Sequence, residues 1–483
     1  MRDILIGRNG TVDPRGVRIR GARISGRLNL DNMKTEAWLS LDSCFLPEGI
    51  SAENADLLGL QLRECLLTSA AESALNMPHA NLRSGPLIWK CTIRATVELG
   101  GAVNMVATKV GGNLNFGSSK LYNDAGPGIG ADNMRVSGSL FLRYGFEARG
   151  RGTLGAVRLN RSRIDNVVDF SDAHLRNEAG PAISADGMVA DSLQIRDGFT
   201  AQSASRSGTI RLPNAKVSTA EISKAMVENG CGPAIIADGM TVGGDLLLGG
   251  KLAATGSGTT ETLSLDHTSV GGSLFFDPSQ VTNSSAPDRR VSIDGLTYPR
   301  VPRGMNLREW LLFLRCGSGG YAPQPYQQLA AVHRAAGHES EARTILRAQR
   351  KHQIDSHTLT GRSTRLWART TGFLLGYGYQ PWRTLVGLLA VAVVSIVLCL
   401  TSPALVHTKN NPRPGTPCRT AERIGVAIDL SVPLIKTNAR NQCDIAGTAD
   451  GDRLAIMGWL LQALAWAFAT LFVAGFTGAV RKS

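Results

Sequence analysis

The side chains that could bind a metal or act as acid and base are widely spread in this sequence. The chain has eight histidines, and four of them share one stretch: His333, His338, His352 and His357. A metal site is conceivable there, but solvated or helix-terminal histidines fit the same spacing, and we favour that interpretation. Three aspartates recur at equivalent places: Asp132, Asp186 and Asp238. We expect them to accept hydrogen bonds in turns. The sequence therefore predicts no catalytic and no metal-binding residue.

Glycine-rich segments are the next candidates, because a nicotinamide or flavin enzyme holds the pyrophosphate at a glycine-rich turn between a strand and a helix. Gly126–Gly130 opens another strand-like repeat and not a helix. Gly376 and Gly378 are followed by Pro381 and an apolar segment. The sequence contains no C-x-x-C pair, P-loop, HExxH or Gly-x-Ser-x-Gly pattern. We predict no cofactor and favour the absence of enzymatic activity.

The cysteines fall into groups with different surroundings. Five are scattered without pairing, as expected of reduced thiols in the cytoplasm: Cys44, Cys65, Cys91, Cys231 and Cys316. Cys418 and Cys443 lie between two long apolar segments, in a stretch that we expect outside the cytoplasm. A disulfide between these two is therefore a hypothesis.

The charge of the chain is concentrated at its C-terminal end. The formal net charge is +13. Residues 1–300 hold 31 Lys and Arg against 30 Asp and Glu, whereas residues 301–483 hold 21 against 9. A basic surface for nucleic acid is thus not predicted for the larger, N-terminal part, and neither is an acidic mimic of DNA. We expect no nucleic-acid partner.

The N-terminal part is a repeat. An aliphatic residue, two variable residues and further aliphatics recur with starts at 110, 136, 164, 189, 217, 242 and 270. A longer unit begins with Gly-Pro at Gly126, Gly180 and Gly232. Short strand-like runs with a fixed period of this size predict a solenoid whose coils bury their aliphatics against each other. We predict a mainly β protein with a right-handed parallel β-helix over 14–300 after an arm at 1–13, and loops protruding at 144–152 and 199–208.

A helical connector is predicted at 303–355. Met305–Leu314 has helical spacing, with Asn306 as its cap, and Tyr326–Ala336 and Glu339–Arg350 form a hairpin broken at Gly337. The segment 356–383 that follows is basic and amphipathic. Its membrane-surface side chains, suited to anionic lipid headgroups, are Arg362, Arg365, Trp367, Arg369, Trp382 and Arg383.

Two segments are long and apolar enough to cross a bilayer, at 384–406 and 454–480. Basic residues flank them on the sides away from the connecting loop at 407–453, which holds seven basic and five acidic residues. The positive-inside rule then predicts a plasma-membrane protein with both termini in the cytoplasm. Small residues in the second span would permit close packing into a homo-oligomer. Within the loop, Ile424–Ile435 is either a re-entrant helix or, as we favour, a helix on the outer leaflet.

Units such as Asn54-Ala55-Asp56-Leu57 and His79-Ala80-Asn81-Leu82-Arg83 resemble the pentapeptide-repeat β-helices. The whole layout also resembles a group of actinobacterial membrane proteins with a degenerate β-helix and two spans. The segments that carry this resemblance are Tyr326–Ala330, Arg334–Glu339, Ala342–Arg343 and Gly376–Arg383. Members of that group are often labelled membrane-associated oxidoreductases, and the resemblance implies that label here, although no cofactor pattern accompanies it.

Two functions of different classes follow. The favoured one is a non-catalytic, membrane-anchored scaffold whose cytoplasmic solenoid binds a protein partner that the sequence does not identify. The alternative is an oligomeric two-span channel gated by the solenoid. A membrane-associated oxidoreductase is the third.

Overall fold

The computed structural model describes residues 2–5, 13, 15–356, 382–408, 415–432 and 437–482. The side chains of residues 3, 382–383 and 474–482 lie outside this description. The chain divides into two compact units, Met1–Ile345 and Leu346–Ser483.

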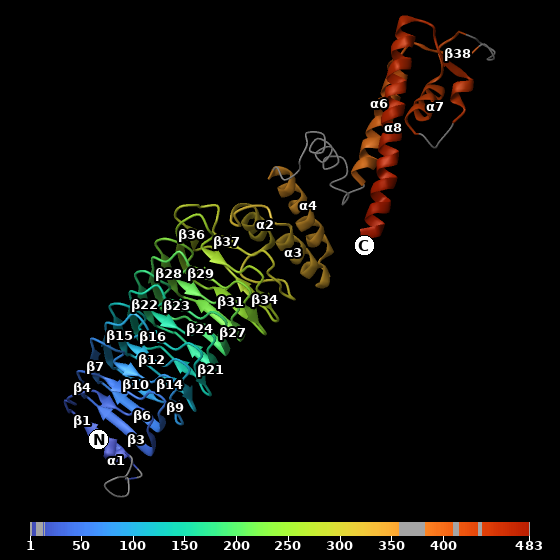
Figure 1. The fold of residues 1–483 in the computed structure, drawn as a ribbon. Helices are drawn as coiled ribbons and strands as arrows, with labels where there is room; N and C mark the ends of the chain where they lie inside the picture. Colours follow the sequence, from blue (N-terminus) through green and yellow to red (C-terminus); the bar gives the residue numbers. More distant parts are fainter. Residues whose placement is uncertain are drawn as a thin grey trace. The chain divides into compact units, whose positions relative to one another are not determined.

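The first unit is a parallel β-solenoid, so the predicted mainly β fold is confirmed. Its coils stack from β1 to β37 (Figure 1), and their strands form three parallel sheets of 16, 10 and 11 strands, which we name sheets A, B and C. Sheet C takes one strand from each coil, which gives eleven coils. Sheet A takes two segments from most coils, and in several coils these fuse into one long strand.

Each sheet collects strands from the whole length of the repeat region. Sheet A contains β1 (Val17–Arg20), β3 (Lys34–Asp42), β6 (Asp56–Arg63), β9 (Asn81–Leu82), β10 (Leu87–Trp89), β13 (Lys109–Val110), β14 (Leu114–Asn115), β17 (Arg135–Val136), β18 (Leu140–Phe141), β21 (Arg163–Asp169), β24 (Val189–Ile195), β27 (Lys216–Ser223), β30 (Thr241–Val242), β31 (Leu246–Gly249), β34 (Ser269–Val270) and β35 (Leu274–Phe276). Sheet B contains β4 (Phe45–Leu46), β7 (Leu66–Ser69), β11 (Thr92–Ala95), β15 (Lys120–Asn123), β19 (Glu147–Gly150), β22 (His174–Asn177), β25 (Thr200–Ser203), β28 (Met226–Asn229), β32 (Ala253–Gly256) and β36 (Val281–Asn283). Sheet C contains β2 (Leu28–Asn29), β5 (Ile50–Ser51), β8 (Leu75–Asn76), β12 (Val103–Asn104), β16 (Ile129–Gly130), β20 (Val157–Arg158), β23 (Ile183–Ser184), β26 (Ile210–Arg211), β29 (Ile235–Ile236), β33 (Leu263–Ser264) and β37 (Val291–Ser292).

The core consists of aliphatic ladders that run through the coils. On sheet B the inward ladder is at most 3% exposed at every rung. Its rungs are Leu46, Leu67, Ile93, Leu121, Ala148, Leu175, Ala201, Val227, Ala254 and Val281. At about 25 cal/mol per Å² of apolar surface buried, such ladders supply the main driving force for stacking.

The repeat starts predicted from the sequence pair with one another between neighbouring coils of the structure, except at one coil. Val110 pairs with Val136 and Val136 with Ile164, as the predicted starts require. Ile164 then pairs with Ala190, and not with Val189. Ala190 is the buried residue of the two, so the inward position is occupied by a small side chain that the aliphatic pattern passed over.

Both predicted loops are wrong, because each contains a strand of sheet B. Residues 144–152 include β19, and residues 199–208 include β25. The inward residues of these strands are Ala148 and Ala201, which are fully buried. Alanine fills the space that a larger aliphatic occupies in neighbouring coils, so the strands lack the hydrophobic signal by which strands are recognised.

The corner aspartates accept hydrogen bonds, and the donors lie in the next coil. Asp132 Oδ1 accepts a hydrogen bond from the backbone N–H of Asn160 at 3.2 Å. Asp186 accepts one from Arg211 Nη2 at 2.6 Å, and Asp238 one from Ser264 Oγ at 2.5 Å. These side chains therefore tie successive coils together at one corner of the solenoid.

Helices cover both ends of the stack. The short α1 (Arg2–Leu5) buries Leu5, whose carbonyl oxygen accepts a hydrogen bond from Thr35 Oγ1 at 2.8 Å. At the other end α2 (Leu307–Cys316) places the rings of Trp310 and Phe313 each 5.5 Å from the ring of Phe276, the last inward side chain of β35. The predicted cap is confirmed, because Asn306 forms a capping box with Glu309.

Two helices lie where the sequence predicts a helical hairpin, α3 (Pro323–Ala335) and α4 (Glu339–Asp355). The second unit contains α6 (Trp382–Thr401), β38 (Leu405–His407), α7 (Thr420–Ser431), the short 3₁₀ helix η2 (Ala439–Asn441), β39 (Cys443–Ile445) and α8 (Ala449–Lys482). Two helical stretches are long and apolar enough to cross a membrane, Thr384–Thr401 and Ala449–Val473.

The two apolar helices pack against each other in the second unit. Val391 of α6 is buried with Leu461 and Ala465 of α8. Gly387 lies against the ring of Phe468, where an added Cβ would come within 2.7 Å of a ring carbon. The helix expected at 384–406 ends at Thr401, and Leu405 and Val406 instead pair with β39.

The cap of the solenoid offers a stability test. Trp310→Ala should lower the free energy of unfolding of the first unit by about 3–5 kcal/mol, because it removes a buried ring and exposes Phe276. Urea titration of the detergent-solubilised protein, followed by the circular dichroism of its β structure, measures this. Leu312→Ala on the same helix is the matched control, since Leu312 is 64% exposed. Equal midpoints for both variants would show that α2 does not cap the stack.

Candidate functional site

The outer face of sheet B is hollowed along much of its length. Three adjoining cavities, of about 400, 250 and 530 Å³, follow one another over its strands. Arg176 lines all three cavities, and Arg149 and Gln202 each line two. We call this continuous depression the sheet-B groove. It runs from Arg94 on β11 to the loop after β36, on the side of the solenoid where β7, β15, β22 and β28 are labelled in Figure 1.

The floor of the groove is the outward ladder of sheet B. Because the strands are parallel and in register, one residue from each coil stands beside the next at the strand spacing of about 4.8 Å. From one end to the other the rungs are Arg94, Tyr122, Arg149, Arg176, Gln202, Glu228, Thr255 and Thr282. The ladder thus begins basic and aromatic, becomes acidic at Glu228 and ends in hydroxyls.

Tyr122 stands between two guanidinium groups. The Cζ atoms of Arg94 and Arg149 lie 5.2 and 5.5 Å from the centre of its ring. These are cation–π contacts from both sides. The Tyr122 hydroxyl donates a hydrogen bond to Glu147 Oε2 at 3.0 Å, and Arg149 Nε lies 2.6 Å from Glu147 Oε1. Burial, followed by the hydrogen bond and charge of Glu147, raises the pKa of Tyr122.

One wall of the groove is built by loops that asparagine side chains hold in place. Asn123, Asn177 and Asn229 each end a strand of sheet B and are buried. Each Nδ2 donates two hydrogen bonds to backbone carbonyls: Asn229, for example, to Ser205 O at 2.8 Å and Pro233 O at 2.6 Å. Satisfying buried backbone carbonyls in this way fixes an otherwise irregular loop.

These asparagines explain the longer repeat seen in the sequence. The acceptors for Asn123, Asn177 and Asn229 include the carbonyls of Pro127, Pro181 and Pro233, the prolines of the three Gly-Pro pairs. Coils in between have Gly150, Ser203 and Gly256 at the same position. The unit of two coils therefore reflects alternate coils that carry the asparagine and its Gly-Pro loop.

Three of the five cysteines that were expected to be scattered are stacked in the structure. Cys44, Cys65 and Cys91 each precede a strand of sheet B in successive coils and are at most 2% exposed. A hydrogen bond from the Cys91 thiol lowers the pKa of Cys65 to about 7 and raises that of Cys91. In the sequence, this stack could have been recognised from the spacing of the three cysteines, which is close to the length of one coil. Their burial keeps both thiols away from solvent reagents, so the stack is part of the core.

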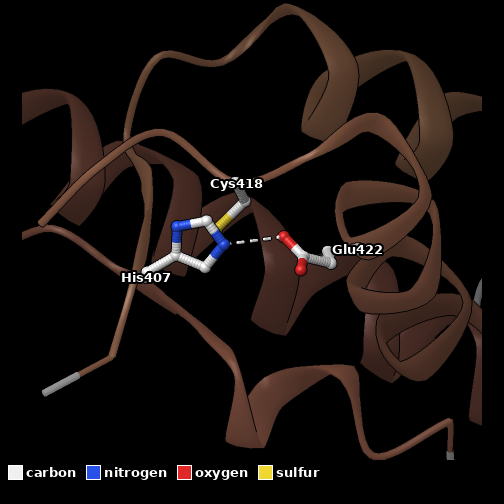
Figure 2. Close-up of side chains that lie close together, drawn as sticks. All are labelled: His407, Cys418 and Glu422. Carbon is white, nitrogen blue, oxygen red and sulfur yellow. Dashed lines mark hydrogen bonds and ion pairs between the residues drawn. The ribbon is translucent and has the colours of Figure 1, made fainter. Parts of the chain in front are cut away.

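Among the described residues, one group has the donor atoms for a metal ion: His407, Cys418 and Glu422. Figure 2 shows the imidazole beside the carboxylate, with His407 Nε2 3.0 Å from Glu422 Oε2 and the sulfur of Cys418 nearby. However, the structure joins Cys418 to Cys443 in a disulfide. A disulfide sulfur is not the thiolate that binds metals, which leaves two ligands, and these already pair with each other.

His407, Glu422 and the disulfide instead hold the segment between α6 and α8 together. His407 Nδ1 lies 2.9 Å from Thr416 Oγ1, and Glu422 Oε2 accepts the backbone N–H of Arg419 at the start of α7. That backbone bond, followed by the hydrogen bond to His407, lowers the pKa of Glu422 despite the opposing effect of burial. The arrangement is structural.

Two further sequence expectations concern the helix at Ile424–Ile435 and the membrane-surface side chains. The helix α7 packs Val426, Ala427 and Leu430 into a cluster with residues of α6 and α8, so its buried face is turned toward these helices. Ser395 Oγ of α6 donates to Ala427 O at 3.0 Å. Of the predicted membrane-surface residues, Arg362, Arg365, Trp367 and Arg369 lie outside the described residues. Trp382 and Arg383 begin α6, and their side chains are not described.

Comparisons with known proteins found no match: no protein-family model, no curated protein and no solved structure is similar to this chain.

The Tyr122–Glu147 contact predicts a pKa change. In Glu147→Gln the pKa of Tyr122 should fall toward its ordinary value, because the carboxylate that disfavours a neighbouring phenolate loses its charge while burial remains. Ultraviolet titration of tyrosinate, with Tyr122→Phe subtracted to assign the signal, measures this. Glu178→Gln is the control, because Glu178 pairs with Arg151. An unchanged titration in Glu147→Gln would contradict the assignment of the cause.

Proposed function

We propose that this protein is a non-catalytic, membrane-anchored β-solenoid that binds a protein partner in the sheet-B groove. The observation that carries the proposal is the continuity of the groove, whose floor is one in-register ladder of polar side chains over eight rungs. Such a surface offers charge, hydrogen bonds and an aromatic ring along one line. An extended ligand gains contacts at each rung, which is how solenoids use their long faces.

The groove is suited to binding more than to bond making. Its arginines, tyrosine, glutamine and glutamate supply hydrogen bonds and charge over cavities that together exceed the volume of a typical small-molecule site. One of its walls is fixed by the asparagine-held loops, so a bound segment meets a preformed surface on that side. Preorganisation of this kind reduces the entropy that binding costs.

The second unit supports membrane anchoring. The two apolar helices are long enough to cross a bilayer. Basic residues precede α6, and Arg481 and Lys482 end α8, which favours cytoplasmic placement of both ends. The disulfide adds to this, since disulfides persist on the oxidising side of a membrane, while the cysteines of the solenoid are free. We therefore propose a plasma-membrane protein with a cytoplasmic solenoid, an external segment between α6 and α8, and a basic segment before α6 that binds anionic headgroups.

The existing cysteines test this topology. In intact cells a membrane-impermeant maleimide should leave the protein unlabelled, because Cys231 and Cys316, exposed and free, face the cytoplasm. Permeabilisation should add two labels, and an impermeant reductant on intact cells should add labels at Cys418 and Cys443. Mass-shift electrophoresis reads each state. Cys231→Ser/Cys316→Ser should lose only the labels that require permeabilisation, and labelling of intact cells before reduction would contradict the topology.

Site-specific photo-crosslinking tests the groove itself. A photoreactive amino acid at Gln202, an exposed rung, should give one discrete adduct of higher mass in living cells, identified by mass spectrometry. The same amino acid at Ser218, exposed on sheet A, is the matched control and should give none. Equal adducts at both positions, or none at Gln202, would argue against a partner in the groove.

A further inference from the structure

Positive charge gathers at one end of the sheet-B groove. The cavity of about 400 Å³ is lined by Arg94, Arg149, Arg151 and Arg176, together with Tyr122. Two of the four guanidinium groups are already paired: Arg149 with Glu147 at 2.6 Å, and Arg151 with Glu178 at 3.2 Å. Arg94 and Arg176 have no ion pair with any carboxylate in the described part of the chain, and both are exposed.

The placement of these arginines works against the stability of the fold. Arg149 and Arg176 are direct cross-strand neighbours. Like charges placed opposite each other in a sheet are destabilising. Glu147 offsets this repulsion, but it pairs with Arg149 only. A polar neutral residue in place of Arg176, such as the Gln202 of the next coil, would remove the repulsion at no cost to the ladder. An acidic ligand would neutralise the same pair.

We propose, on the basis of the function proposed above, that this end of the groove binds an extended, carboxylate-rich segment of the partner protein. Arg94 and Arg176 are three rungs apart, which is about 14 Å at the strand spacing, and an extended peptide covers that distance in about four or five residues. Carboxylates at alternate positions point the same way and meet the arginine row. Guanidinium groups bind carboxylates through paired hydrogen bonds.

The acidic neighbours of the row favour a peptide over a nucleic acid. Glu147 and Glu178 lie beside the arginines, and the ladder turns acidic at Glu228, two rungs beyond Arg176. A phosphate backbone carries a charge at every nucleotide and would meet these carboxylates. A peptide can place acidic residues over the arginines and a neutral or basic residue over Glu228, where Gln202 Nε2 donates to Glu228 Oε2 at 3.0 Å.

The test measures binding of a defined probe to the detergent-solubilised full chain. The probe is a fluorescein-labelled heptapeptide with glutamate at alternate positions and threonine between them, followed by anisotropy. Arg94→Gln/Arg176→Gln should weaken binding by at least about tenfold, because two charge-assisted contacts are lost. Arg94→Lys/Arg176→Lys should recover part of it, since lysine keeps the charge without the planar fork.

A matched variant separates the site from net charge. Arg18 and Arg20 are exposed arginines beside another cavity, of about 430 Å³, on sheet A. Arg18→Gln/Arg20→Gln removes the same charge and should bind the peptide as the unmodified protein does. The peptide with glutamine in place of glutamate should not bind. The thermal unfolding midpoint of Arg18→Gln/Arg20→Gln should match that of the unmodified protein, because both side chains are exposed. That of Arg94→Gln/Arg176→Gln should be at least as high, because this variant loses the repulsion between Arg149 and Arg176.

The outcomes also separate this inference from the function on which it rests. If both double variants lost peptide binding equally, net charge alone would explain the effect and the proposed site would be wrong. Tighter binding of a single-stranded oligonucleotide than of the acidic peptide would assign the groove to nucleic acid. If the Gln202 adduct forms while the peptide fails to bind, the partner groove stands and its acidic occupant is overturned. If neither occurs, the proposed function fails with it.

Discussion

The solenoid depends on backbone hydrogen bonds that each coil can make only with its neighbours. Strands such as Val103–Asn104 contain two residues and have no stability alone; Ala102 N–H donates to the carbonyl of Pro127 in the next coil, and Met105 N–H to that of Gly130. This pairing fixes the register. Once the register is fixed, every inward side chain faces its equivalent in the next coil, and every outward side chain joins a row. The same bonds that hold the core therefore set the positions of the arginines, Tyr122 and Glu228 on the face of sheet B.

The architecture could be predicted because its signals repeat. Aliphatic residues spaced by a coil, Gly-Pro at alternate coils, a capping asparagine at Asn306 and two long apolar segments each act locally and agree with the global fold. The backbone conformation of the corner residues was less predictable. Many corner residues with positive φ are not glycine, among them Lys90, Tyr144 and Lys224. Cross-coil bonding imposes that conformation on side chains that rarely adopt it, at a cost of about 1–2 kcal/mol each.

The candidate site could not be predicted from the sequence. The strands of the groove carry Ala148 and Ala201 inward and charged or polar residues outward, so two of them had the composition of loops. Nothing in a linear pattern places Arg94 beside Tyr122, because their proximity arises from the coil length between them. The opposite holds for Cys418 and Cys443, whose place between two apolar segments was enough to suggest the pair that the structure contains.

The alternation of asparagine with glycine or serine at the end of the sheet-B strands has a consequence for how such a chain can change in size. An asparagine cannot replace Gly150, where even a Cβ would come within 2.9 Å of the Gly126 carbonyl, and Gly256 is similarly confined by Thr262. Between the coils of Asn123 and Asn283, where the alternation holds, insertion or loss of a single coil would set two like coils side by side and leave one loop without its side-chain tie. Length variants of that part of the solenoid should therefore differ by even numbers of coils, so that duplication, recombination and engineered shortening there proceed in pairs.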